Sequence, residues 1–254
     1  MKTPISILIM DVTNSTGFTD TKELTNYLGQ VVDWIDMWTR GIVSTKVKKR
    51  YGDEIIVVTE NYFTAYLLAF YIILFWKYEK HPPYLGITFG MTEDDVLDID
   101  LEEWNDPLVK SARIASETIK QSKRRPPILF HRLNSENDTE YPMVSVLNIL
   151  SEMQFKLIRE QSPYQHAVFK LYLLYQKQVD IANRISRKPA TISKQLKDGN
   201  SETIIDALDT IERMLNRAQT AGVGIKPNSI AKKTDVLKKK IRNSLLSDIP
   251  FELD

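Results

Sequence analysis

The chain of 254 residues contains no cysteine. Disulfides, thiolate metal sites and a cysteine nucleophile are therefore excluded, and this composition favours a reducing cytoplasm. The three histidines, His81, His131 and His166, are scattered and lack the spacing of metal ligands. The formal net charge is only +1, so a surface that binds nucleic acid would have to be a local cluster of cations.

Long hydrophobic runs are also missing. The most apolar segment, residues 62–76, is shorter than the roughly 20 residues that a membrane-spanning helix needs. We interpret it as a buried helix. The N-terminus has no basic start followed by a long apolar core, so we expect no signal peptide and no membrane partner.

The length favours two compact units, each with its own core. The polar segment 132–141 is typical of an exposed connection, and almost everything after it has helical periodicity. We therefore predict an α+β unit over residues 1–135, a helical unit over 142–220 and a basic tail over 221–254. The lysines of this tail either contact DNA phosphates or are simply solvated.

The first unit reads as β-α-β-β-α-β-α-β, which contains the split βαβ pattern of ferredoxin-like sheets. Strands are expected where short apolar runs are bounded by turn residues, and helices where apolar residues recur every three or four positions. The predicted strands are 5–11, 43–50, 55–59, 84–90 and 127–131, and the predicted helices are 22–40, 62–79 and 107–121.

Two carboxylates are expected to meet at one edge of this sheet. Asp11 ends the first strand, and Asp53 lies in the Gly52-Asp53 corner of the hairpin. Paired carboxylates suit magnesium, which takes one or two of them together with substrate phosphates. The alternative is that Gly52-Asp53 only forms the turn and Asp11 only ends a strand.

The predicted helix after residue 106 carries three charged residues on one face. Asp106, Lys110 and Arg113 are spaced by four and three. Asp106 is also a good N-cap in front of Pro107. This face either lines a nucleotide site or is a solvated, charged surface with a cap.

Four segments resemble class III nucleotidyl cyclase domains in order and spacing: "LIMDVTNSTGFTD", "KKRYGDEIIVV", "YLGITFG" and "WNDPLVKSARIAS". The chain looks closest to the SatD-like family, in which a diverged cyclase-like domain is joined to a C-terminal helix-turn-helix. The resemblance covers residues 5–120 and, separately, 160–200. It implies a cyclase-palm βαββαβ fold for the first unit and a second, all-α helix-turn-helix unit.

The resemblance also implies roles for individual residues. Asp11 and Asp53 match the two metal-binding carboxylates, which implies Mg²⁺ as cofactor. Lys49 and Asp106 match the pair that reads a purine base, and Arg113 falls on the catalytic arginine that stabilises the transition state. Lys110 shares one helix face with Asp106 and Arg113 and is a further candidate for nucleotide binding. The sequence departs from the cyclases at Val109, where an asparagine orients the ribose, and in extra residues between Asp11 and Gly17.

Residues 177–199 have the spacing of a helix-turn-helix, with Ser186 at the turn position where glycine is usual. The inward positions are apolar: Ile181, Ala182, Ile185, Ile192 and Leu196. The outward positions are cationic or polar and suit phosphates and base edges in a major groove. These candidate DNA contacts are Arg184, Arg187, Lys188, Thr191, Ser193, Lys194, Gln195 and Lys197. The alternative is a three-helix packing unit without DNA contact.

Three functions follow from these patterns. The first is a DNA-binding regulator whose cyclase-like unit senses a nucleoside triphosphate or a cyclic nucleotide. The second is a magnesium-dependent nucleotidyl cyclase or nucleotidyltransferase with an appended regulatory unit. The third is a cyclase-like unit that serves only as a scaffold for dimerisation. The apolar stripe of residues 201–219 either packs within the chain or forms a homodimer, which would suit a two-fold operator.

Overall fold

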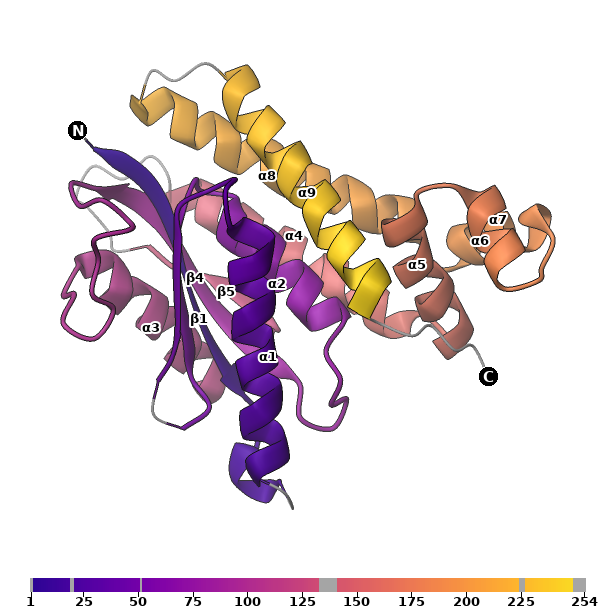
Figure 1. Cartoon of the computed structure of the whole chain (residues 1–254), viewed down its shortest axis with the longest axis horizontal. Helices are drawn as coiled ribbons and strands as arrows, with labels where there is room; N and C mark the ends of the chain where they lie inside the picture. The colour runs from indigo at the N-terminus through magenta and orange to yellow at the C-terminus, as the bar shows by residue number, and fades with distance from the viewer. Residues whose placement is uncertain (1, 19–20, 51, 133–140, 224–226, 249–254) are drawn as a thin grey trace.

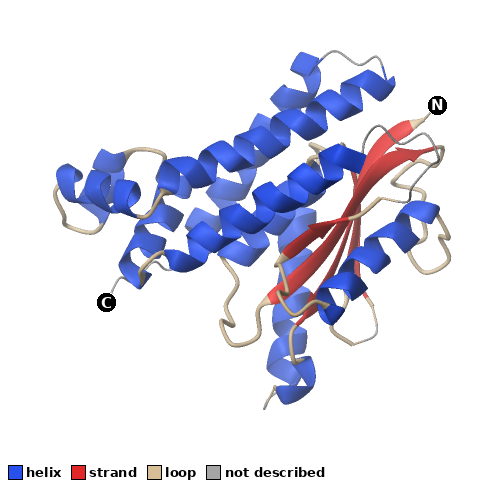
Figure 2. Cartoon of the chain, turned by 180° about the vertical axis from the view of Figure 1, so that it is seen from behind, coloured by secondary structure: helices blue, strands red, loops and turns tan. Residues whose placement is uncertain are grey.

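The computed structural model describes residues 2–18, 21–50, 52–132, 141–223 and 227–248. They form one five-stranded sheet with helices on both faces, and a group of helices beyond it (Figures 1 and 2). The strands are β1 (Thr3–Val12), β2 (Thr45–Lys49), β3 (Ile55–Glu60), β4 (Pro83–Thr92) and β5 (Ile128–Phe130). The α-helices are α1 (Thr21–Thr39), α2 (Thr64–Leu74), α3 (Pro107–Gln121), α4 (Tyr141–Glu160), α5 (Pro163–Tyr175), α6 (Gln178–Arg184), α7 (Pro189–Asp198), α8 (Ser201–Val223) and α9 (Pro227–Asp248). The fold class is α+β.

The sheet has the strand order β2-β3-β1-β4-β5. The central strand β1 pairs antiparallel with both β3 and β4, whereas β5 pairs parallel with β4 and follows it through α3. The five predicted strands all form. The hairpin between β2 and β3 turns at Gly52, whose φ of 86° is a conformation that glycine adopts without a steric penalty.

Alternate residues of β1 enter different cores, as the two-residue period of a strand requires. Those on one face meet α1 and α2, and those on the other meet α3 and the loop that precedes it. The first set is Leu8, Met10 and Val12, and the second is Ile5, Ile7 and Ile9. The sheet is thus buried on both faces, which explains why β1 reads as one continuous apolar run.

Helix α3 lies close against β4 because the residues of β4 on that face are small. At Gly86 an added Cβ would lie 2.4 Å from the carbonyl oxygen of Ala112 and 2.5 Å from the amide nitrogen of Ser116. Two residues further on, Thr88 donates a hydrogen bond to Ser111 of α3 at 3.2 Å. This close approach fixes α3, and the side chains that it carries, relative to the end of β1.

Helix α2 is shorter than predicted, since it ends at Leu74 rather than near residue 79. Ten of its residues are buried, because it lies between the sheet and the helices of the second half. Because α2 is enclosed on all sides, its sequence is apolar throughout and has no polar face. Among the described residues, no helix combines the length and the apolar character needed to cross a bilayer.

The two predicted units share one core. Phe155 of α4, Leu208 of α8 and Leu237 of α9 belong to the same buried cluster as Leu8 of β1. Buried polar bonds also connect the halves. The Tyr66 hydroxyl of α2 donates to Oε1 of Gln154 in α4 at 2.6 Å, and Nε2 of Gln154 donates to the carbonyl oxygen of Ile204 in α8 at 2.7 Å. The hydrophobic core therefore continues across the predicted boundary between the sheet unit and the helical unit.

The basic tail predicted for residues 221–254 is wrong over residues 227–248, which form the packed helix α9. Its lysines lie mainly on the outer face, and one side of the helix is apolar and buried. The buried residues are Ile230, Leu237, Ile241 and Leu245. Helix α9 also contacts α1, where Nε1 of Trp38 donates to Oγ of Ser244 at 3.0 Å.

Helices α5, α6 and α7 form a separate small core at one end of the molecule (Figure 1). The inward residues predicted for residues 177–199 are buried, apart from Ile185, which is half-buried. They pack with Val168 and Leu171 of α5. Ser186, in the turn between α6 and α7, has a φ of 51°, so the position has the left-handed conformation in which glycine is usual.

Candidate functional site

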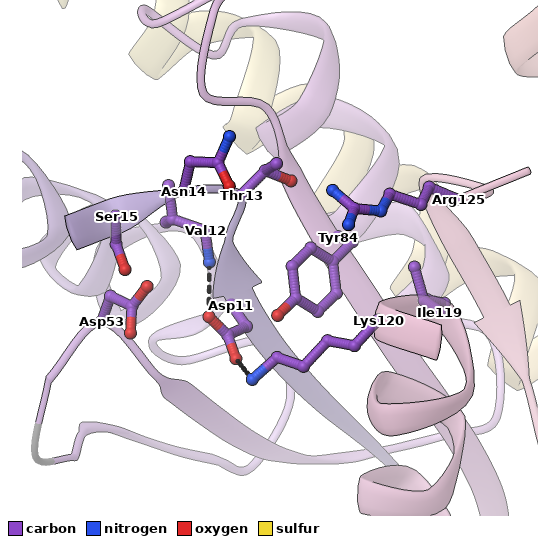
Figure 3. A pocket seen from close by; sticks show the side chains of 10 residues that line it. All are labelled: Asp11, Val12, Thr13, Asn14, Ser15, Asp53, Tyr84, Ile119, Lys120 and Arg125. Carbon is purple, nitrogen blue, oxygen red and sulfur yellow. Dashed lines mark hydrogen bonds and ion pairs between the residues drawn. The ribbon is translucent and has the colours of Figure 1, made fainter. Parts of the chain in front are cut away.

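A pocket of about 300 Å³ lies where β1, the β2-β3 hairpin and the end of α3 meet (Figure 3). Both predicted metal-binding carboxylates line it. Figure 3 shows Asp53 and Ser15 on one side of Asp11, and Tyr84 and Lys120 on the other. Its volume is at the lower end of the range for small-molecule sites, and its lining is mainly polar and charged. This chemistry suits a charged ligand.

Asp11 is held at the end of the central strand, directly opposite Tyr84 of β4 in the antiparallel register. Its side chain is buried, and one carboxylate oxygen accepts a hydrogen bond from the backbone N–H of Val12 at 2.8 Å. The other oxygen forms an ion pair with Nζ of Lys120, which extends from the last turn of α3. The buried negative charge is thus balanced by a cation of the same chain.

Lys120 is firmly charged in this position. Burial lowers the pKa of its ammonium group, but hydrogen bonds to Asp11 and Tyr84, together with the charge of Asp11, outweigh burial and raise the pKa. Burial likewise raises the pKa of the Tyr84 hydroxyl, which therefore stays protonated near neutral pH. Nζ of Lys120 also lies 5.7 Å from the centre of the Tyr84 ring. Asp11, Tyr84 and Lys120 form one connected group.

Asp53 differs from Asp11 because one of its oxygens lacks a partner. Oδ2 is buried and makes no hydrogen bond within the described part of the chain. Buried polar atoms in folded proteins almost always have a partner, since leaving one unsatisfied costs about 1–3 kcal/mol. An unsatisfied carboxylate oxygen that lines a pocket is therefore ready to bind a cation or a donor group.

The loop after β1 supplies further polar groups. The N–H of Thr13 donates to the carbonyl oxygen of Pro82 at 3.2 Å, and Nδ1 of His81 lies 3.1 Å from the carbonyl oxygen of Thr13. Beyond this anchor, Asn14 has the left-handed φ of 51°, and its side chain and that of Ser15 line the pocket. The loop therefore adds a carboxamide and a hydroxyl group to the lining.

Arg125 supplies a second cation. It follows α3, lines the pocket and has no ion-pair partner among the described residues. The lining therefore holds two carboxylates and two cations, with hydroxyl groups between them. Such a set suits a metal-bound phosphate group better than a neutral ligand. The carboxylates can bind the metal ion, and the cations can bind the phosphate oxygens.

The residues fit magnesium, although they do not form an all-protein metal cage. Within the described ranges, no three His, Asp or Glu side chains lie close enough to hold a metal together. Magnesium often takes only one or two carboxylates and completes its shell with water and phosphate oxygens. The free oxygen of Asp53 fits that requirement. Asp11 offers its second oxygen only if Lys120 moves away from it.

The other residues matched to the cyclases do not line this pocket. Arg113 is about half exposed and forms an ion pair with Glu54 at 3.7 Å, and Glu54 also pairs with Arg50 at the same distance. Lys49 lines a second hollow together with Arg50 and Glu54, and neither Asp11 nor Asp53 lines it. Within a single chain, Lys49 and Arg113 therefore lie outside the pocket that contains the two carboxylates.

The remaining residues of the α3 face are also outside the pocket. Asp106 is the N-cap of α3, as predicted, and its Oδ1 accepts a hydrogen bond from the N–H of Leu108 at 2.7 Å. Lys110 is exposed. Val109 is buried in the core between α3 and the sheet, so this departure from the cyclase pattern serves packing. For Asp106 the capping role predicted as the alternative is present.

The candidate DNA-contacting residues lie together on the outer side of α6 and α7. Thr191 and Gln195 are half-buried, and the others are exposed: Arg184, Arg187, Lys188, Ser193, Lys194 and Lys197. None of the five cations in this set has an ion-pair partner among the described residues. Residues 177–199 contain six cations and two acidic residues. The molecule is nearly neutral, but this end of it is basic.

Sequence reasoning missed Lys120, Arg125 and Tyr84. Two signals were available. Lys120 follows Arg113 by seven residues, which places both on the same side of α3, and Tyr84 pairs with Asp11 once the strands are aligned end to end. Arg125 follows the helix in a loop, where periodicity gives no information.

A scan against models of known protein families and a search of curated protein sequences both found no match to this chain.

Proposed function

We propose that the chain is a cytoplasmic DNA-binding regulator whose sheet half, a ferredoxin-like or cyclase-palm fold, binds a magnesium-complexed nucleotide. The strand order supports the fold, because β2-β3-β1-β4 with a central β1 follows from the split βαβ arrangement. The observation that carries the function is the basic outer side of α6 and α7, with its five unpaired cations. In a helix-turn-helix protein this surface would bind the DNA backbone and place α7 in the major groove.

DNA binding is tested by fluorescence anisotropy with a labelled duplex over a series of salt concentrations. Arg187→Gln and Lys194→Gln should each weaken binding and reduce the slope of log K against log[salt] by about 1, because each removes a phosphate contact. The control is Lys2→Gln, since Lys2 is exposed at the opposite end of the molecule. Equal binding by all three variants would contradict the assignment of this surface.

The pocket beside Asp11 supports the nucleotide part of the proposal. Asp53, with or without Asp11, would hold the magnesium ion, and when bound this ion would neutralise charge on the phosphate oxygens. Lys120 and Arg125 would bind the phosphate groups, and the hydroxyls of Ser15 and Tyr84 would donate hydrogen bonds. A phosphate that draws Lys120 away also frees the second oxygen of Asp11. Ligand binding would thereby replace Lys120 as the partner of Asp11 at the end of β1.

Nucleotide binding is tested by the melting temperature with ATP, GTP, CTP and UTP, each with and without magnesium. A magnesium-dependent rise for one nucleotide is expected, because a ligand that binds only the folded state stabilises it. Asp53→Asn should abolish the rise, whereas Glu117→Gln should keep it, since Glu117 is exposed on α3 outside the pocket. An unchanged melting temperature with all four nucleotides would favour the scaffold function instead.

The second candidate function is a magnesium-dependent nucleotidyl cyclase or nucleotidyltransferase. It is favoured by Asp11 and Asp53 lining one pocket. Within one chain, however, Arg113 is paired with Glu54 outside that pocket, so a cation other than Arg113 would have to face the developing charge. Any nucleotide-consuming activity should therefore be lost in Lys120→Met. Activity that persists in this variant and disappears in Arg113→Met would favour the cyclase assignment of Arg113.

A further inference from the structure

Helix α4 carries an apolar stripe on its solvent-facing side. Three large apolar side chains are exposed there: Val146 is 43% exposed, Ile149 58% and Met153 59%. They are three and four positions apart, so they lie on one face of the helix. The opposite face, which includes Leu147 and Phe155, is buried where α4 packs on β5 and α8. The stripe therefore points away from the helix's own packing partners.

The stripe is continuous, which distinguishes it from the other exposed apolar side chains. Leu150 and Leu157 extend it and are half-buried. From residue 146 to residue 157 it covers about 16 Å of the helix. Single exposed apolar residues are normal, whereas a continuous apolar surface marks a contact site. The other large apolar side chains exposed among the described residues each lie on a different segment: Met37, Leu97, Val179 and Val236.

The two borders of the stripe differ, and this difference indicates which partner fits. One border is apolar, with Leu150 and Leu157. The other border is charged, with Glu152 and Lys156 one turn apart. Among the described residues Glu152 has no ion-pair partner, and Lys156 pairs only with Glu160 of its own helix, at 3.8 Å. Such an exposed pair is weak, so both charges are available to charges on a partner.

A second copy of α4 has the charge pattern that complements this border. When two copies pack antiparallel about a two-fold axis, the charged border of each faces the charged border of the other. With the axis near Met153, Glu152 of each copy lies opposite Lys156 of the other, which gives two ion pairs. In the same register the two Met153 side chains meet at the axis, and Ile149 of each copy lies against Leu157 of the other. One register thus satisfies the apolar and the charged contacts together.

We propose that α4 is a homodimer interface, in which two copies of the chain pack this stripe antiparallel. The apolar stripe of residues 201–219, the other candidate for dimerisation, is buried in the chain's own core through Ile204, Leu208, Ile211 and Leu215. One helix face of this length buries less than the roughly 1,200 Å² of a stable interface. The dimer is therefore weak, with a Kd of about 10–100 µM. The proposal does not depend on nucleotide or DNA binding.

Sedimentation equilibrium of the full chain tests the dimer, at concentrations from about 1 to about 500 µM. Ile149→Lys should raise Kd at least about tenfold, because it buries an unpaired charge in the interface. Val236→Lys is the matched control and should dimerise as the unaltered chain does, since Val236 is 54% exposed on α9. Melting temperatures at about 1 µM, where the chain is a monomer, verify that each variant is folded.

Charge reversal tests the register. Glu152→Lys and Lys156→Glu each place like charges opposite one another, so each should raise Kd about three- to tenfold. The double reversal restores opposite charges across the axis and should return Kd to within about threefold of the value for the unaltered chain.

The absence of cysteine allows a second test of the register. Met153→Cys places one thiol of each copy beside the axis, within reach of a disulfide. Mild oxidation should therefore link this variant at least about fivefold faster than Val236→Cys, whose position has similar exposure away from α4.

Four outcomes overturn the proposal. The first is a chain that stays monomeric up to about 500 µM, which would leave the stripe to a different protein. The second is equal dimerisation of Ile149→Lys and Val236→Lys. The others are a double reversal that dimerises no better than the single reversals, and equal rates of disulfide formation in the two cysteine variants.

Discussion

Asp11 and Asp53 line the same pocket but differ in what satisfies their oxygens. The hairpin turn leaves Oδ2 of Asp53 buried and unpaired, whereas Lys120 and the N–H of Val12 occupy both oxygens of Asp11. A ligand that carries positive charge can therefore bind Asp53 directly, but must compete with Lys120 for Asp11. Equivalent residues in a sequence pattern can thus offer different chemistry, because neighbours distant in sequence decide which atoms are free.

A half-buried histidine in the first turn of α5 makes stability depend on pH. Burial and the charge of Lys170 lower the pKa of His166 to about 4. In the unfolded chain the pKa is about 6.5. Between these values the unfolded state binds the proton more readily, so stability is unaffected above pH 6.5 and falls as the pH drops towards 4. At pH 5 the loss should be about 2 kcal/mol.

The pH effect is measured by urea unfolding at pH 7 and pH 5. His166→Gln serves as the comparison, because glutamine remains neutral and can still approach Gln161, whose Oε1 lies 3.3 Å from Nδ1 of His166. The variant should lose about 2 kcal/mol less than the unaltered chain between the two pH values. An identical loss in both proteins would show that other groups dominate the acid dependence.

At the scale of elements, the position of α3 depends on the absence of a side chain at Gly86. Gly86→Ala should destabilise the chain by about 3 kcal/mol, because the new methyl group meets backbone atoms of α3 that cannot move separately. Gly29→Ala is the matched control. Gly29 lies within α1, and an added Cβ there meets nothing within 4 Å. This change should be neutral or stabilise by up to about 1 kcal/mol.

Urea unfolding at pH 7 measures both glycine variants. A second consequence is expected in the pocket, since α3 also carries Lys120. If α3 is displaced in Gly86→Ala, the ion pair of Lys120 with Asp11 should weaken as well. Equal stability of the two alanine variants would show that α3 moves away from β4 without cost.

The elements themselves were largely predictable from the sequence. The strands, the hairpin and the start of α3 at Asp106 follow from local patterns of period two, turn residues and caps. The end of α2 was not, because a helix enclosed by apolar neighbours has no polar face to mark its limits. The apolar side of α9 was present in the sequence as Ile230, Leu237, Ile241 and Leu245, but the lysines between them suggested a solvated tail.

The candidate site was predictable only in part. Asp11 and Asp53 were placed together correctly, since both follow from the hairpin topology. The pairing of Arg113 with Glu54 and of Lys120 with Asp11 was not predicted. In both ion pairs, a side chain of α3 has several charged residues within reach. The partner that it contacts is set by the position of α3 over the sheet, which no local sequence pattern shows. Whether the two predicted units have separate cores also depends on tertiary packing, and a local sequence pattern does not determine it.

At the scale of the whole molecule, the shared core should make the chain unfold as one body. All four tryptophans, Trp34, Trp38, Trp76 and Trp104, lie in the first 135 residues. Their fluorescence therefore reports on the sheet half, whereas far-UV circular dichroism is dominated by the many helices of the second half. The two urea transitions should coincide.

Leu215→Ala sharpens this test. Leu215 is fully buried in α8 within the common core, so the change should cost about 3 kcal/mol. Both transitions should shift to lower urea by the same amount, although α8 contains no tryptophan. A tryptophan transition that stays in place while the dichroism transition moves would instead support two independent units. Met153→Ala, at an exposed position of α4, should leave both transitions unchanged.

The hydrogen bond between Trp38 and Ser244 joins residues that are 206 positions apart. At a synthesis rate of 5–20 residues per second, about 10–40 s pass between the translation of these two residues. Throughout that interval the surface of α1 that α9 later covers has no partner from its own chain. The nascent protein therefore presents apolar surface to the ribosome's surroundings until α9 has been made. We therefore expect this apolar surface to need protection until α9 has been made, a requirement that is separate from the stability of the finished fold.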